Sequence, residues 1–154
     1  MKRIISALII VALVFSLSSC EEEPSPLKVM IELRRLLSLD SVIYSTECEE
    51  HEDGYIREGL VERIYRTDKP ITATLALILS ARPENTSECA LFQTDLDSEM
   101  RLIDEAIEER IRLLSTDPES ILIIKKGNLI FYSTFPDREF VRECFYRALS
   151  SSRG

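Results

Sequence analysis

Residues 121–134 read ILIIKKGNLIFYST and contain the clearest secondary-structure pattern in the chain. Two apolar runs, 121–126 and 129–134, flank the pair Gly127-Asn128, which favours a tight type I′ or II′ turn. The stretch therefore predicts a β-hairpin. A helix is expected after it, because Asp137 suits an N-cap and apolar residues then recur at helical spacing. This predicted buried stripe comprises Phe140, Val141, Cys144, Phe145, Ala148 and Leu149.

The same hairpin-then-helix pattern occurs once more upstream. Two apolar runs, 75–79 and 89–94, are joined by a polar segment that contains proline, which predicts a second hairpin. The next helix is expected to have Asp97 as its N-cap and Glu99 in its positively polarised first turn. Its predicted apolar stripe comprises Met100, Ile103, Ile107, Ile111 and Leu114.

Shorter elements are predicted before these two units. Ser25-Pro26 signals the start of a helix that runs to about Leu39, with a cap hydroxyl and a proline in the first turn. Residues 42–44 are compatible with a short strand, and residues 47–54 read as an exposed acidic loop. A short helix is expected over 57–65.

These elements together predict an α+β fold. An N-terminal helix precedes two hairpin-helix units, and the hairpins are expected to form a four-stranded, mainly antiparallel sheet. Both later helices are expected on one face of that sheet, each burying an apolar stripe of about one hundred degrees.

The first twenty residues have the three regions of a signal peptide. Lys2 and Arg3 precede an uncharged run, 4–17, which is shorter than the roughly 20 residues that a membrane-spanning helix needs. A permanent transmembrane helix is therefore the weaker interpretation. The run ends in Leu17, Ser18, Ser19 and Cys20, which resembles the lipobox of bacterial lipoproteins.

The lipobox resemblance implies a specific chemistry at Cys20. Its thiol would receive a diacylglycerol through a thioether, and cleavage before it would make it the new N-terminus. Two or three acyl chains anchor a protein stably, whereas one binds only marginally. An ordinary cleavage site followed by a chance cysteine is the alternative.

This interpretation divides the chain into four parts. Residues 1–19 are the expected signal peptide, and residues 20–25 are the lipidated cysteine with an acidic tether. Residues 26–150 are expected to form a single α+β domain, and residues 151–154 a tail. The five tether residues reach only about 17 Å when fully extended, so the domain is expected close to the membrane surface.

Charge and cysteine content restrict the partners and the covalent links. Without residues 1–19 the chain keeps 17 basic and 27 acidic residues, a net charge of −10, which disfavours nucleic acid and anionic lipid head groups. With Cys20 lipidated, Cys48, Cys89 and Cys144 remain, and three cysteines cannot all pair within one chain. Either one disulfide forms or all three stay reduced; Cys144 lies in the predicted helix stripe and is expected to be buried.

The order of features resembles a family of small clostridial lipoproteins known only as a domain of unknown function. The resemblance covers most of residues 26–150 and includes Ala90-Leu91-Phe92, Glu109-Arg110-Ile111 and Lys126-Gly127-Asn128-Leu129-Ile130, with a linker that is short at 115–120. These motifs are structural, and no catalytic residue comes with the resemblance. It implies the outer face of a cell membrane; in a Gram-negative host, outer-membrane sorting stays open.

The strongest local cluster of chemical groups is the segment 48–53. Thiolate, imidazole and carboxylate groups can all bind zinc or a similar ion, but the second pair of ligands that a structural zinc site needs is missing. An exposed acidic loop is therefore the favoured interpretation. The weak metal candidates are Cys48, His51, Glu52 and Asp53.

No catalytic residue is predicted, and no cofactor is expected. One histidine offers a single candidate base, and no spacing singles out a pair of carboxylates. The leading hypothesis is a non-enzymatic lipoprotein, held on the extracytoplasmic face of a membrane by Cys20, that binds another envelope protein, a peptide or a wall component. The competing hypothesis is a carboxylate-based or metal-assisted hydrolase that uses the loop from Cys48 to Asp53.

Overall fold

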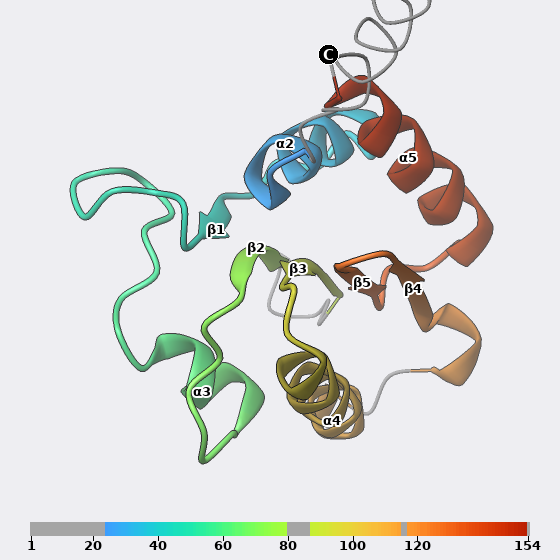
Figure 1. Ribbon diagram of the computed structural model, residues 1–154. Helices are drawn as coiled ribbons and strands as arrows, with labels where there is room; N and C mark the ends of the chain where they lie inside the picture. The colour runs from blue at the N-terminus through green and yellow to red at the C-terminus, as the bar shows by residue number, and fades with distance from the viewer. Residues whose placement is uncertain (1–23, 80–86, 115–116, 154) are drawn as a thin grey trace, which may run out of the picture.

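The computed structural model describes residues 24–79, 87–114 and 117–153 (Figure 1). The predicted signal peptide, Cys20 and the polar segment 80–86, where a turn is predicted, lie outside these residues. In chain order the elements are α2 (Pro26–Leu36), β1 (Ile43–Ser45), α3 (Leu60–Tyr65), β2 (Thr74–Leu79), β3 (Glu88–Gln93), α4 (Asp97–Leu114), the 3-10 helix η1 (Pro118–Ser120), β4 (Leu122–Lys126), β5 (Leu129–Ser133) and α5 (Arg138–Ser151).

The strands form one antiparallel sheet in the order β1-β2-β3-β5-β4. Both predicted hairpins are present, β2 with β3 and β4 with β5, and β3 joins them by pairing with β5. The α+β class is therefore confirmed. The predicted number of four strands is wrong for the described residues, because β1 adds a fifth strand at the edge beside β2.

Helices cover both faces of the sheet, so the expectation that both later helices share one face is wrong. Helices α2 and α5 pack against each other on one face, and α3 and α4 lie on the other (Figure 1). The reason is visible in β2, where the consecutive residues Leu75, Ala76, Leu77 and Ile78 are all buried. Side chains alternate between faces along a strand, so an uninterrupted apolar strand needs cover on both sides.

The sheet thereby separates two hydrophobic cores. On the α2 and α5 face, Phe131 of β5 stacks on Phe145 of α5, with ring centroids 4.2 Å apart. On the α3 and α4 face, Phe92 meets Tyr65 edge to face at 5.3 Å. Each core takes alternate residues of the same three central strands.

Local sequence signals set several element ends as predicted. The Ser25 hydroxyl accepts a hydrogen bond from the Lys28 N–H and caps α2. Helix α2 ends at Leu36 rather than near residue 39, because Ser38 takes a left-handed conformation and the Ser38 and Leu39 N–H groups bond back to α2 carbonyls. Gly127 has a φ of 59° in the β4–β5 turn, as the Gly-Asn pair predicted.

Two predictions about the later helices need correction. Asp97 is the first residue of α4 and not its N-cap, because the Leu96 carbonyl accepts the bond from the Met100 N–H. Phe140 is 48% exposed, whereas the other five residues of its predicted stripe are buried. One residue corresponds to about 100° of helix rotation, so Phe140 lies to the side of the face that Val141 begins.

The two edges of the sheet differ. Gly54 lies against β1 on the side away from β2, where its carbonyl accepts a hydrogen bond from the Ser45 N–H at 2.8 Å. No strand of the described residues covers the outer side of β4. That edge carries the half-exposed Ile123, followed by Lys125 and Lys126.

Candidate functional site

The predicted acidic loop does not extend freely into solvent but folds back against the edge of the sheet. Gly54 makes this possible: its φ is +90°, and a Cβ atom there would lie 2.0 Å from the Ile43 carbonyl oxygen. Only glycine tolerates both conditions. A second contact fixes the loop to α2, since the Glu47 carboxylate accepts a hydrogen bond from the Leu27 N–H at 2.7 Å. The loop and α2 thus form two walls of one depression.

This depression, which we call the edge groove, has a volume of about 740 Å³. Helix α2 forms one wall, the segment leading into β1 forms the floor, and the acidic loop forms the other wall. The lining residues are Leu27, Ile31, Arg34, Asp40, Ser41, Val42, Ile43, Cys48, Glu52 and Asp53.

Three of the four weak metal candidates, Cys48, Glu52 and Asp53, line the edge groove. His51 does not: its side chain is 79% exposed, and its Nδ1 lies 3.6 Å from a Glu49 carboxylate oxygen. Across residues 24–79, 87–114 and 117–153, no set of three or more histidine, cysteine or acidic residues is arranged to hold a metal ion. These four residues are close in the sequence, but the structure does not place all four around one point.

The groove is negatively charged. Its single arginine, Arg34, donates a hydrogen bond to the Ser41 carbonyl at 3.0 Å, and Glu52 accepts one from the Glu49 N–H at 2.7 Å. The carboxylates of Asp40 and Asp53 are exposed and have no bonding partner among the described residues. Carboxylates outnumber the one guanidinium by three to one, so the groove attracts cationic groups.

Cys48 is the only cysteine in the groove, and its surroundings oppose ionisation. Burial raises the pKa of the Cys48 thiol, and the neighbouring carboxylates of Glu52 and Glu47 raise it further. Because the thiolate is the reactive form, this environment keeps Cys48 a weak nucleophile.

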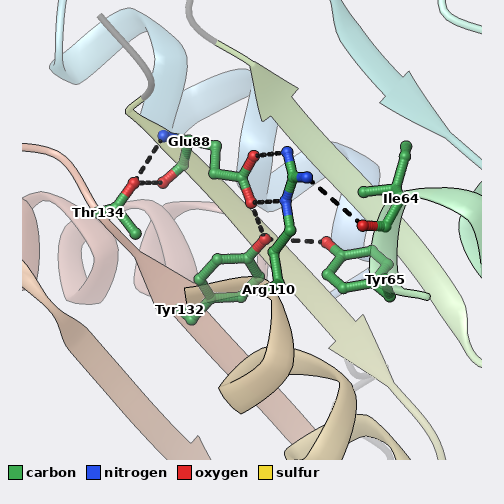
Figure 2. Close-up of polar contacts among 6 residues, drawn as sticks. All are labelled: Ile64, Tyr65, Glu88, Arg110, Tyr132 and Thr134. Atoms are coloured by element: carbon green, nitrogen blue, oxygen red, sulfur yellow. Dashed lines mark hydrogen bonds and ion pairs between the residues drawn. The ribbon is translucent and has the colours of Figure 1, made fainter. Parts of the chain in front are cut away.

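A second polar cluster lies inside the core on the opposite face of the sheet (Figure 2). Glu88, at the start of β3, is 2% exposed and faces Arg110 of α4. Two parallel hydrogen bonds join them, from Arg110 Nε at 2.9 Å and from Nη2 at 2.6 Å. Tyr132 of β5 donates its hydroxyl to the same carboxylate, and the Tyr65 hydroxyl lies 3.1 Å from that of Tyr132.

Every side chain in this buried network is satisfied. Burial raises the pKa of both tyrosine hydroxyls, and the nearby Glu88 carboxylate raises each further, so both stay protonated. Arg110 also reaches the Ile64 carbonyl at 3.4 Å, which connects α3 to α4 (Figure 2). No described buried side-chain polar atom lacks a hydrogen-bond partner. The network therefore joins β3, β5, α3 and α4 rather than offering an unused reactive group.

Sequence reasoning missed this network. Arg110 entered only as part of a structural motif, and Glu88 and the two tyrosines were not singled out. The contacts span 22 to 67 residues along the chain, so no local spacing could reveal them. A charged residue next to the apolar run of β3 was the one available signal, because acids are rarely buried without a partner.

Glu99 is a second buried carboxylate with a structural position. It accepts hydrogen bonds from the Thr72 N–H at 2.5 Å, the Thr72 hydroxyl at 2.7 Å and the Thr94 hydroxyl at 2.6 Å. Burial raises the pKa of Glu99, but these hydrogen bonds outweigh that effect and lower the pKa below its ordinary value. Glu99 thus ties the segment before β2 to the end of β3.

The predicted lipidation residues Leu17, Ser18, Ser19 and Cys20 precede the described residues. Within the described part of the chain, no helix has the length and apolar character required to cross a bilayer. Comparison with known proteins leaves the resemblance to small clostridial lipoproteins as a prediction. No family model, no curated protein and no solved structure matches the chain.

Proposed function

We propose that this protein is a lipoprotein anchored through Cys20 on the extracytoplasmic face of a membrane, and that its domain is a non-enzymatic binding module. The observation that carries the proposal is the edge groove at the start of the domain. Its wall begins with Leu27, one residue after the first residue of α2. A ligand in the groove would therefore be held near the membrane surface.

The distance along the chain supports this arrangement. Residues 21–25 separate Cys20 from α2, and five residues span at most about 17 Å. The groove combines half-exposed aliphatic side chains with a rim of carboxylates, a combination typical of surfaces that bind another molecule. The most direct partners are an envelope protein, a peptide or a wall component.

The anchor is tested by the intact mass of membrane-extracted protein beside a Cys20→Ala variant. The expected mass is that of residues 20–154 plus acyl groups, and the variant should lose the acyl groups and the membrane association. A protein of unacylated mass, or one released as a soluble product, would contradict the anchor and return Cys20 to the cysteines available for pairing.

The binding role is tested by site-specific photo-crosslinking in intact cells. A photoreactive residue at Val42, in the groove, should give a discrete adduct. The matched control is Leu96, on the opposite face of the sheet, because both side chains are about half exposed at 47% and 58%. Equal adducts from both positions, or none from Val42, would contradict a specific binding role for the groove.

A hydrolase is the second candidate, and one observation favours it: Cys48, Glu52 and Asp53 line the same groove. Purified mature protein would be assayed against a panel of ester, peptide and glycoside substrates. Turnover that is lost in both Cys48→Ser and Asp53→Asn, while the fold is retained, would replace the binding proposal with the enzyme. Turnover that persists in both variants would assign the activity to a contaminant.

A further inference from the structure

The floor and one wall of the edge groove form an aliphatic strip. Ile31 on α2 and Val42 before β1 are each 47% exposed, and both line the groove beside Leu27 and Ile43. Ile43 is 7% exposed, so the strip presented to a ligand is formed by Leu27, Ile31 and Val42, which carry no charge. Covering them with an apolar side chain removes their surface from water and favours binding.

The rim of the same groove selects the charge of its ligand. Asp40 and Asp53 stand at the strip with no bonding partner among the described residues, and Glu52 adds a third carboxylate. Arg34 is held by the Ser41 carbonyl. The whole mature chain carries a net charge of −10, so the groove and the protein around it repel anionic ligands such as acidic head groups.

The acidic loop already occupies part of the outer edge of β1. The Ser45 N–H points away from β2 and bonds to Gly54. Strand residues alternate in the direction of their N–H and C=O groups, so the main chain of Ile43, two residues earlier, also faces this outer side. Gly54 packs against the Ile43 carbonyl oxygen, so a segment in the groove is bound through its side chains. Successive side chains of an extended chain point to opposite sides, so an extended segment can present one set to the strip and the alternate set to the carboxylates.

From this combination we propose that the edge groove docks an extended protein segment in which lysine or arginine alternates with aliphatic residues. The aliphatic side chains contact the strip formed by Leu27, Ile31 and Val42, and the basic side chains pair with Asp40, Glu52 and Asp53. This inference rests on the proposed binding function and names the class of its partner.

Four acetylated and amidated nonapeptides test the proposal against the full mature protein in detergent. They alternate lysine with valine, glutamate with valine, lysine with serine, and serine with valine. Titration calorimetry should detect binding of the lysine–valine peptide alone, and added salt should weaken it. No binding of that peptide, or equal binding of the glutamate–valine or lysine–serine peptide, would overturn the proposal.

Groove variants locate the binding. Asp40→Asn combined with Asp53→Asn is expected to weaken binding about three- to tenfold, as for exposed ion pairs. Val42→Ser is expected to weaken it about tenfold through lost apolar contact. Asp68→Asn and Leu96→Ser are exposed controls away from the groove, and their affinity should stay within about twofold. Controls that weaken binding as much as the groove variants would overturn the assignment.

Two measurements on the same samples separate the possible failures. Intact mass reports acylation, so acylated protein that does not bind the lysine–valine peptide refutes only the peptide proposal. Unacylated protein that does bind refutes only the anchor. Light scattering reports self-association, and a dimer that Val42→Ser abolishes would assign the groove to a second copy of this chain instead.

Discussion

Removing Arg110 while keeping Glu88 leaves a carboxylate in the protein core without its cation. The two parallel hydrogen bonds at 2.9 and 2.6 Å disappear, and only the Tyr132 hydroxyl still donates to that carboxylate. Breaking a buried ion pair on one side costs about 3–5 kcal/mol of unfolding free energy. The Arg110 side chain is 21% exposed, so water can enter in its place. We therefore expect about 3 kcal/mol for Arg110→Met, at the lower end of the range.

A double-mutant cycle separates the interaction from general damage to the core. Glu88→Gln alone is expected to cost about 2 kcal/mol, because it removes the charge that Arg110 faces. The double variant is expected to cost about 2 kcal/mol as well, rather than the roughly 5 kcal/mol of two independent effects. Urea unfolding followed by circular dichroism measures each value on residues 20–154 with Cys20→Ser, provided that the denaturant slope stays constant.

An exposed ion pair supplies the control for this cycle. Arg112 bonds to Glu109 on the outer side of α4, and its side chain is 74% exposed. Arg112→Met should therefore change the unfolding free energy by no more than about 0.5 kcal/mol. The reasoning is refuted if Arg110→Met costs less than about 1 kcal/mol or if the two core substitutions prove additive.

Three further measurements address other features. Glu99→Gln should make the melting temperature less dependent on pH in acid, which thermal melts between pH 7 and 3 measure. The pKa of Glu99 is lowered in the folded state, so its contribution to stability is present above the ordinary value of 4.5 and is lost as the pH falls below it. Gly54→Ala should cost at least about 2 kcal/mol and Gly127→Ala about 1 kcal/mol in urea unfolding, because both have positive φ but only Gly54 meets a backbone atom; equal costs would contradict this. In the folded protein with Cys20→Ser, a thiol reagent should label only Cys48, and slowly, with the two buried core cysteines reacting after unfolding; fast labelling of all three would contradict their burial.

Local sequence patterns were sufficient to predict most elements of the fold. The Gly127-Asn128 pair and the runs beside it predicted the second hairpin, and Asp137 caps α5 by accepting from the Phe140 N–H as expected. The error in the layers had a physical cause. Two helices on one face would suit strands with a single buried face. Strands β2 and β5 are apolar at nearly every position, which indicates strands that are buried on both faces.

The candidate site was harder to predict, because distant segments build it. The acidic loop was recognised as a cluster of chemical groups, but Gly54 was not identified as the residue that folds it onto β1. Without that contact, no local sequence pattern predicts that α2, the segment before β1 and the loop lie next to one another. The Glu88 and Arg110 pair was equally hard to predict, because a buried charge is stable only with a partner that the tertiary fold brings to it.

The open edge at β4 has a consequence for solubility. Lys125 pairs with Asp104 of α4 at 2.6 Å, and Lys126 lies 5.7 Å from the Tyr146 ring centre of α5, so one positive charge stands on each face of this edge. A second molecule that tried to extend the sheet would bring its own lysines against them, and such charges oppose edge-to-edge aggregation. Neutralising both lysines beside the exposed Ile123 would remove that protection, even though no contact of the core would change.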